Sequence, residues 1–181
     1  MKKSHSKTLH CALLLAASLL MTPSLYAEPP VQVYIMAGQS NMQGKGSIEG
    51  DHGGSLRGIV KNHPKQYGFF ADEKGEWVER KDVWIHYDLY PFRELRYGLL
   101  KPGYGASGGQ IGPEFGFGHA MGEESEGKVL LIKAAWGGKS IGHNFLPPSV
   151  GKYPVPSEPE QDPGYFFHRT VQLVAEVTEN M

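Results

Sequence analysis

Two short apolar segments of this chain each stop abruptly at a polar turn that contains glycine. Residues 31–37 read VQVYIMA and run into GQSN, and residues 129–135 read VLLIKAA and run into WGGKS. The first segment is rich in β-branched and aromatic residues, which is typical of a strand. The second is almost continuously apolar, as expected of a parallel strand that is covered on both faces. Both segments therefore predict strands of a sheet, each followed by a tight turn.

Two helical patterns accompany these strands. Pro113 stands where a helix would begin, directly before the segment EFGFGHAMGE, and residues 165–179 carry apolar side chains at the spacing of an amphipathic helix. The apolar residues expected on the inner faces are Phe115, Phe117, Ala120 and Met121 in the first helix, and Phe167, Val171, Val174 and Val177 in the second. Strands that alternate with helices predict an α/β domain with a parallel sheet.

The stretch between the two predicted strands has no sustained periodicity from residue 44 to residue 109. We interpret it as a long insertion of turns and short strands rather than as a separate domain, and the role of residues 45–107 stays open. Two strands do not make a doubly wound sheet, which needs about four or five. Either the insertion contains further strands or the sequence is incomplete, and the final helix, with no strand after it, favours incompleteness.

Residues 1–27 have the three parts of a secretory signal peptide. These are a basic start with Lys2, Lys3 and Lys7, an apolar run from Cys11 to Met21, and a small residue, Ala27, at the cleavage point. The apolar run is too short for a membrane-spanning helix, which needs about 20 residues. The sequence therefore predicts an exported protein, periplasmic or secreted, with a domain at residues 28–181 and no membrane contact after cleavage.

Charge and cysteine content exclude several classes of function. The chain has 18 Lys and Arg against 19 Asp and Glu, without a basic cluster after the first residues, so a nucleic-acid partner is not expected. Its one cysteine, Cys11, lies in the predicted signal peptide, which leaves no thiol chemistry for the domain. No metal-ligand spacing occurs, and neither a metal nor another cofactor is predicted. The oligomeric state is not indicated.

The two turns carry the residues with chemical potential. Ligands of open α/β sheets bind beyond the carboxyl ends of the strands, where both turns are expected. Ser40 can present its hydroxyl there, although a serine after a strand can also be only a helix N-cap. Gly138 can offer a backbone N–H that no side chain obstructs. A nucleophilic hydroxyl and a fixed N–H donor are two parts of an acyl-transfer site.

The segments VYIMAGQSNMQGKG, GPEFGFGHAM and LIKAAWGGKSI together resemble the sialate O-acetylesterase and carbohydrate esterase family 6 branch of the SGNH hydrolases. The resemblance runs over most of residues 31–181. It implies a three-layer α/β/α, flavodoxin-like fold and the removal of O-acetyl groups from a carbohydrate, such as sialic acid or a plant polysaccharide. It also implies Ser40 as the nucleophile, with the N–H groups of Ser40 and Gly138 as oxyanion donors. The pocket residues it implies are Gln39, Asn41, Gly112, Glu114, Trp136 and Gly137.

The sequence departs from that family in what it lacks. The third oxyanion block, written HQGE or FQGWND, and the DxxH block that supplies the His and Asp of the triad are absent from the 181 residues. Because these blocks are absent, the carboxyl-terminal part of the fold is expected to be missing. Without a base, the chain alone is expected to be nearly inert. The alternatives are a catalytically inactive carbohydrate-binding module that uses Trp136 as a sugar platform, and a gene fragment. His86, His119 and His143 are weak candidates for a substitute base.

Overall fold

The computed structural model describes residues 27–89, 95–150 and 162–179. The predicted signal peptide falls almost wholly on residues 1–26, outside the described residues. Within the described ranges, no helix is long and apolar enough to cross a membrane.

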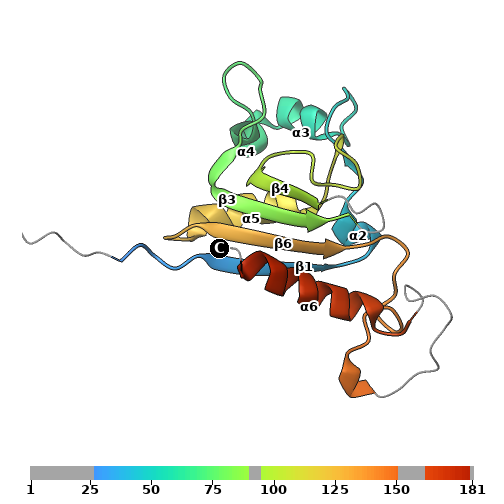
Figure 1. Ribbon diagram of the computed structural model, residues 1–181. Coiled ribbons are helices and arrows are strands. Elements are labelled where there is room, and N and C mark those ends of the chain that lie inside the picture. Colours follow the sequence, from blue (N-terminus) through green and yellow to red (C-terminus); the bar gives the residue numbers. More distant parts are fainter. Residues whose placement is uncertain (1–26, 90–94, 151–161, 180–181) are drawn as a thin grey trace, which may run out of the picture.

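A four-stranded sheet forms the centre of the domain, in the order β1 (Gln32–Gly38), β6 (Val129–Ala135), β3 (Arg80–Asp88) and β4 (Leu95–Leu100). Strand β6 is parallel to both of its neighbours, and only β4 is antiparallel. Helix α5 (Pro113–Glu124) covers one face of the sheet and α6 (Tyr165–Thr178) lies on the other, as Figure 1 shows. The predicted three-layer α/β/α architecture with a mostly parallel sheet is confirmed.

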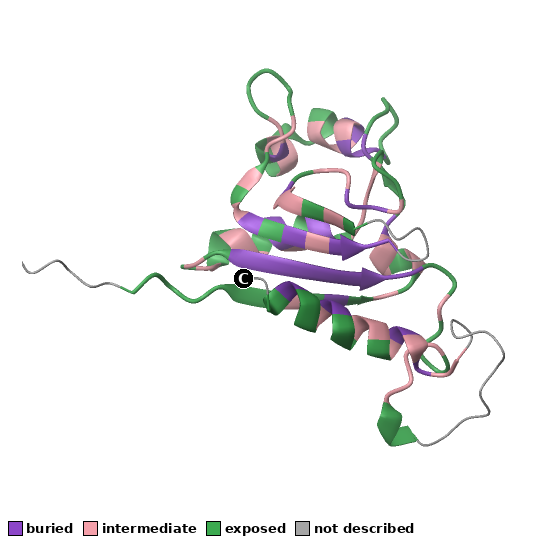
Figure 2. Ribbon diagram, viewed as in Figure 1, coloured by how far each residue is buried: buried purple, intermediate pink, exposed green. Residues whose placement is uncertain are grey.

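Every residue of β6 is buried, because the strand lies between two others and under helices on both faces (Figure 2). Its side chains alternate between two hydrophobic clusters, as the period of a strand requires. On the α5 face, Val129 and Leu131 pack with Val83, Ile85 and Tyr87 of β3. On the α6 face, Leu130, Ile132 and Ala134 pack with Phe166, Leu173 and Val177.

Both predicted helices form, but their inner faces differ in part from the prediction. In α5 the buried residues are Glu114, Phe115, Gly118 and His119, while Phe117 and Met121 are only partly buried and Ala120 is exposed. In α6 the buried residues are Phe166, Leu173 and Val177, whereas Val171 is 54% exposed. Two sets of apolar residues overlap along α6, and the set that packs on the sheet is Phe166, Leu173 and Val177.

Of the two explanations for the small number of predicted strands, the first is confirmed, because residues 44–109 contain further strands. This stretch supplies β3 and β4, two strands of the central sheet. It also contains short elements around the sheet's rim. These are α3 (Leu56–Asn62), α4 (Pro64–Tyr67), the 3-10 helix η1 (Gly68–Phe70) and β2 (Gly46–Ser47), which pairs with β5 (Gln110–Ile111); a second 3-10 helix, η2 (Pro148–Val150), follows β6.

A buried histidine occupies the third hydrophobic region, next to α5. His119 is 3% exposed, and its ring lies 4.8 Å from those of Phe70 and Phe115, measured between centroids. Neither ring nitrogen has a hydrogen-bond partner among the residues that the structure describes. Burial, together with the positive charge of Arg80, lowers the pKa of His119 to about 4. The native state therefore holds this ring neutral.

We expect His119 to make the protein less stable in acid. In the unfolded chain the pKa of His119 returns to about 6.5. Below that pH the imidazole is therefore protonated in the unfolded state, while it stays neutral in the native state. The free energy of unfolding should lose about 3 kcal/mol from this group by pH 4, and nothing above pH 7. Urea titrations at pH 7 and pH 4 should show a smaller acid loss in a His119→Phe variant. An equal loss in both proteins would contradict the prediction, since Asp82 and Glu123 nearby are common to both.

Candidate active site

The structure brings the two glycine-containing turns together at one edge of the sheet. Strands β1 and β6 are parallel and in register from Gln32 to Gly38, so both end at the same level, with Gly38 beside Ala135. The backbone N–H of Trp136 donates to the carbonyl of Gly38 over 3.1 Å, which continues the pairing into the turns. The GQSN and WGG segments therefore lie side by side beyond the carboxyl ends of adjacent strands.

Ser40 opens a single helical turn, α2 (Ser40–Gln43), directly after β1. The residue that caps this turn is Gln39, whose Oε1 accepts from the backbone N–H of Ser40 at 3.2 Å and from its Oγ at 2.8 Å. The reading of Ser40 as a helix N-cap is therefore wrong. Ser40 is half-buried, while Gln39 and Asn41 are exposed, so the hydroxyl lies at the rim of the sheet and not in the interior.

The second turn offers an unobstructed backbone. Gly137 and Gly138 are both exposed, and Gly138 has φ +73°, a left-handed conformation that favours glycine. A Cβ placed on Gly138 would meet no atom within 4 Å, and its N–H has no hydrogen-bond partner in the described part of the chain. Gly137 lies against Gln43 of the first turn, since a Cβ there would come within 3.0 Å of the Gln43 Oε1. The glycine turn thus contacts the serine turn through Gly137.

Two predicted pocket residues, Gly112 and Glu114, lie at the start of α5, close to the end of the serine turn. Glu114 is fully buried, and its carboxylate contacts the Lys133 ammonium at 2.5 Å and accepts from the Gly112 N–H at 2.8 Å. Gly112 lies against the backbone of Gly44, at the end of the serine turn. The Glu114 side chain therefore does not line a pocket, because its carboxylate is enclosed and paired inside the protein, whereas Gly112 is half-buried and its place in the pocket stays a prediction.

Trp136 belongs to the core. It is 2% exposed and packs against Phe166, with ring centroids 4.9 Å apart, and against Phe145 at 6.0 Å. Its prediction as a pocket residue is therefore corrected in favour of the alternative reading as core filler, since the indole has no open face on which a sugar could stack. The binding-module hypothesis loses the residue on which it rested.

In the part of the chain that the structure describes, none of the three weak candidates for a base is hydrogen-bonded to the Ser40 hydroxyl. His119 is enclosed by Phe70 and Phe115, and His86 lies on β3 with its ring stacked on that of Tyr97, 5.5 Å between centroids. His143 is exposed in the loop after β6. Among residues 27–89, 95–150 and 162–179, the Ser40 hydroxyl is hydrogen-bonded only to Gln39.

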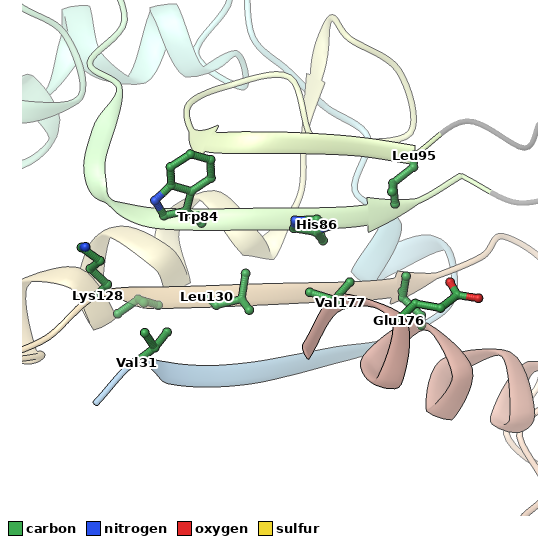
Figure 3. Close-up of a pocket in the computed structure, with 10 residues that line it drawn as sticks. Val31, Trp84, His86, Leu95, Lys128, Leu130, Glu176 and Val177 are labelled. Atoms are coloured by element: carbon green, nitrogen blue, oxygen red, sulfur yellow. The ribbon is translucent and has the colours of Figure 1, made fainter. Parts of the chain in front are cut away.

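A groove of about 690 Å³ lies elsewhere, on the α6 face of the sheet. Figure 3 shows that it runs between β3, the start of β6 and the end of α6, with Trp84, His86 and Leu130 in its wall. It opens over the first residues of β6, whereas the two turns follow the last residue of that strand. The groove is therefore not part of the candidate active site.

Sequence reasoning missed two residues that the structure places at the turns. Gln43 ends the serine turn and contacts Gly137, and Lys133 lies buried beneath it in β6. The signal for Lys133 was visible, because a lysine in the middle of an otherwise apolar strand requires an internal partner.

Comparisons with known proteins give a family match and a structural similarity. A family model described as "Carbohydrate esterase, sialic acid-specific acetylesterase" matches residues 30–157, which include both turns and helix α5. Among curated proteins, no match was found. A solved X-ray structure of a protein from Arabidopsis thaliana is similar, with 18% sequence identity and a TM-score of 0.42. The match covers 82% of this chain and 52% of the plant protein, so this chain spans about half of its length.

Proposed function

We propose, from the premise that this chain belongs to the carbohydrate esterase family of sialic acid-specific acetylesterases, that the protein removes O-acetyl groups from a carbohydrate. Ser40 is the nucleophile in this proposal, and the N–H groups of Ser40 and Gly138 are the oxyanion donors. We propose likewise that residues 1–27 direct export, so that the enzyme meets its substrate outside the cytoplasm. No cofactor takes part.

One observation carries the proposal more than any other. The serine turn and the glycine turn leave adjacent parallel strands at the same level, which supports a role for the Ser40 hydroxyl and the Gly138 N–H in one site. A carbonyl attacked by the hydroxyl develops its negative charge within reach of such a donor. The Ser40 N–H is bonded to the Gln39 side chain in this structure, so Gln39 must turn away before that N–H can serve the oxyanion.

The reaction runs in two steps. The Ser40 Oγ bonds to the acetyl carbon while its proton leaves for a base; the tetrahedral intermediate then collapses, and the sugar oxygen departs with that proton. Water attacks the acetyl-serine in the same way and releases acetate, which restores the hydroxyl. This double displacement needs no redox partner.

A general base is required, because a serine hydroxyl is a weak nucleophile at neutral pH. The Gln39 amide oxygen that accepts the Ser40 hydroxyl proton is too weak a base to remove it. We propose that the base is a histidine of the DxxH block expected for this family, and that it belongs to the natural full-length protein. The sugar is proposed only as a class, acetylated sialic acid or an acetylated plant polysaccharide, because the acetyl group itself fills little of a pocket.

Covalent labelling of the natural full-length protein tests the proposal. The protein is treated with a fluorophosphonate, digested and mapped by mass spectrometry, and acetate release is measured in parallel from O-acetylated sialic acid and from acetylated xylan. We expect the label on Ser40 and acetate from at least one substrate. A label on another serine, or acetate release that the fluorophosphonate does not block, would contradict the proposal.

A further inference from the structure

A buried ammonium lies directly beneath the serine turn. Lys133 is 0% exposed and interrupts the apolar sequence of β6, the most enclosed strand of the sheet. It pairs in register with Met36, two residues before β1 ends at Gly38. Burying an ammonium is costly unless all of its protons find acceptors, so the surroundings of Lys133 must supply them.

Three acceptors surround the Lys133 Nζ, one for each of its protons. They are the carbonyl of Gln43 at 2.8 Å, the carbonyl of Tyr104 at 2.7 Å and the Glu114 Oε2 at 2.5 Å. The ring of Tyr87 lies on a further side, its centroid 4.5 Å from Nζ. The donor capacity of the ammonium is therefore used completely, and it joins the serine turn, the loop at Tyr104 and the start of α5.

The buried pair with Glu114 keeps this ammonium in place. Burial lowers the pKa of Lys133 and raises that of Glu114, while the attraction between the two charges opposes both shifts. Glu114 is in turn fixed by the Gly112 N–H at the N-terminus of α5. The Glu114 carboxylate therefore holds the Lys133 ammonium at a fixed position. From that position the ammonium donates to the Gln43 carbonyl.

The bond to Gln43 matters because the serine turn cannot hold its own shape. An isolated helix of one turn is unstable in water, so α2 depends on contacts from outside. Inside the turn, the Gln43 N–H donates to the Gln39 carbonyl at 2.7 Å and the Gly44 N–H donates to the Ser40 carbonyl at 3.0 Å. The Gln43 carbonyl points out of the turn and accepts a hydrogen bond from Lys133, which lies in β6 of the sheet.

We propose that Lys133 is a positioning residue of the esterase site, which fixes the direction of the Ser40 hydroxyl through its hydrogen bond to the Gln43 carbonyl. The inference rests on the proposed function. Lys133 is enclosed and touches no substrate, so its removal should slow the chemical step and leave substrate binding nearly unchanged.

A double variant, Lys133→Met with Glu114→Leu, tests this in the natural full-length protein. Replacing a buried ion pair by apolar side chains of similar size is often neutral or stabilising, so this variant should fold. We expect its kcat for acetate release to fall by about 100-fold, the cost of a misplaced reacting group, with KM changed by less than about twofold. The rate of fluorophosphonate labelling at Ser40 should fall in parallel with kcat.

Two further variants separate positioning from mere stability. Glu114→Gln removes the counter-charge but leaves the Lys133 amine beneath Gln43, with an amide oxygen as its acceptor, so its kcat should fall clearly less than that of the double variant. Leu173→Ala removes core contacts on the opposite face of the sheet, where Leu173 is 1% exposed, and should lower the melting temperature without lowering kcat per folded molecule. Rates are therefore compared below the lowest melting temperature of the set.

The outcomes distinguish the two proposals. A wild-type protein without acetate release and without label on Ser40 would overturn the proposed function. An active wild type with a folded double variant of equal kcat would overturn the positioning role alone. That role would also fail if Glu114→Gln were as impaired as the double variant, or if Leu173→Ala lost kcat to the same extent.

Discussion

Replacing Ser40 by alanine should lower the turnover for acetate release from the natural full-length protein by about 10⁴-fold to 10⁶-fold, as removal of a triad member does in other serine hydrolases. The proposed nucleophile has no substitute in the turn, because Gln39 and Asn41 on either side carry only amides. Initial rates of acetate release at saturating substrate check this. Some activity above the uncatalysed rate should remain from the oxyanion donors and from substrate binding.

The same substitution should leave the fold intact. The Ser40 hydroxyl is half-buried and, among the residues that the structure describes, is hydrogen-bonded only to the neighbouring Gln39, so its loss should change the free energy of unfolding by about 0.5 kcal/mol or less. Ser47→Ala, at an exposed serine of β2, is the matched control and should keep wild-type turnover. Full activity in the Ser40→Ala protein would mean that the nucleophile is another group.

The parts of the fold that the sequence predicted are those with one strong signal each. Strand β6 was predicted with its observed bounds, because a strand buried on both faces is almost purely apolar. Helix α5 begins at Pro113, as predicted, because proline lacks the N–H that the first turn leaves unbonded anyway. Signals of this kind depend on local sequence, so these two elements can be predicted without knowing how the rest of the chain folds.

Further strands in the insertion were considered, but β3 and β4 could not be located from the sequence because their pattern is mixed. In β3, Val83, Ile85 and Tyr87 face the α5 cluster, while Trp84 and His86 face the groove side. An aromatic and a histidine on the open face, after a charged start, interrupt the alternation of apolar and polar residues that marks a half-buried strand. Only the pairing with β6 reveals that these residues belong to a strand.

The sequence indicated the two turns that form the candidate site but not the buried ion pair beneath them. The two turns follow from the glycines and from the strands before them, so their residues could be named in advance. The buried pair of Lys133 and Glu114 joins residues 19 positions apart in the sequence, and it forms only when α5 packs on the sheet. Trp136 illustrates the same limit, because whether an indole is exposed depends on α6, which comes later in the chain.

Gly44 ends the serine turn and lies against the backbone of Gly112, where there is no room for a side chain. Gly44 has φ +84°, and a Cβ on it would lie 2.0 Å from the Cα of Gly112, a backbone atom that cannot swing aside. Its N–H closes the serine turn on the Ser40 carbonyl, and its carbonyl accepts from the N–H of Ala106 at 2.8 Å. Any movement that relieves the clash therefore pulls on the serine turn.

A Gly44→Ala variant should accordingly lose about 2–5 kcal/mol of unfolding free energy, by adding the strain of a left-handed alanine to that of an overpacked contact. In contrast, Gly108→Ala should be nearly neutral, because a Cβ at Gly108 meets no atom within 4 Å. Urea denaturation of the two variants measures the difference. Where Gly44→Ala still folds, its labelling at Ser40 should also be slower, since the turn has moved. Equal stability of the two variants would show that the contact between Gly44 and Gly112 is looser than the structure places it.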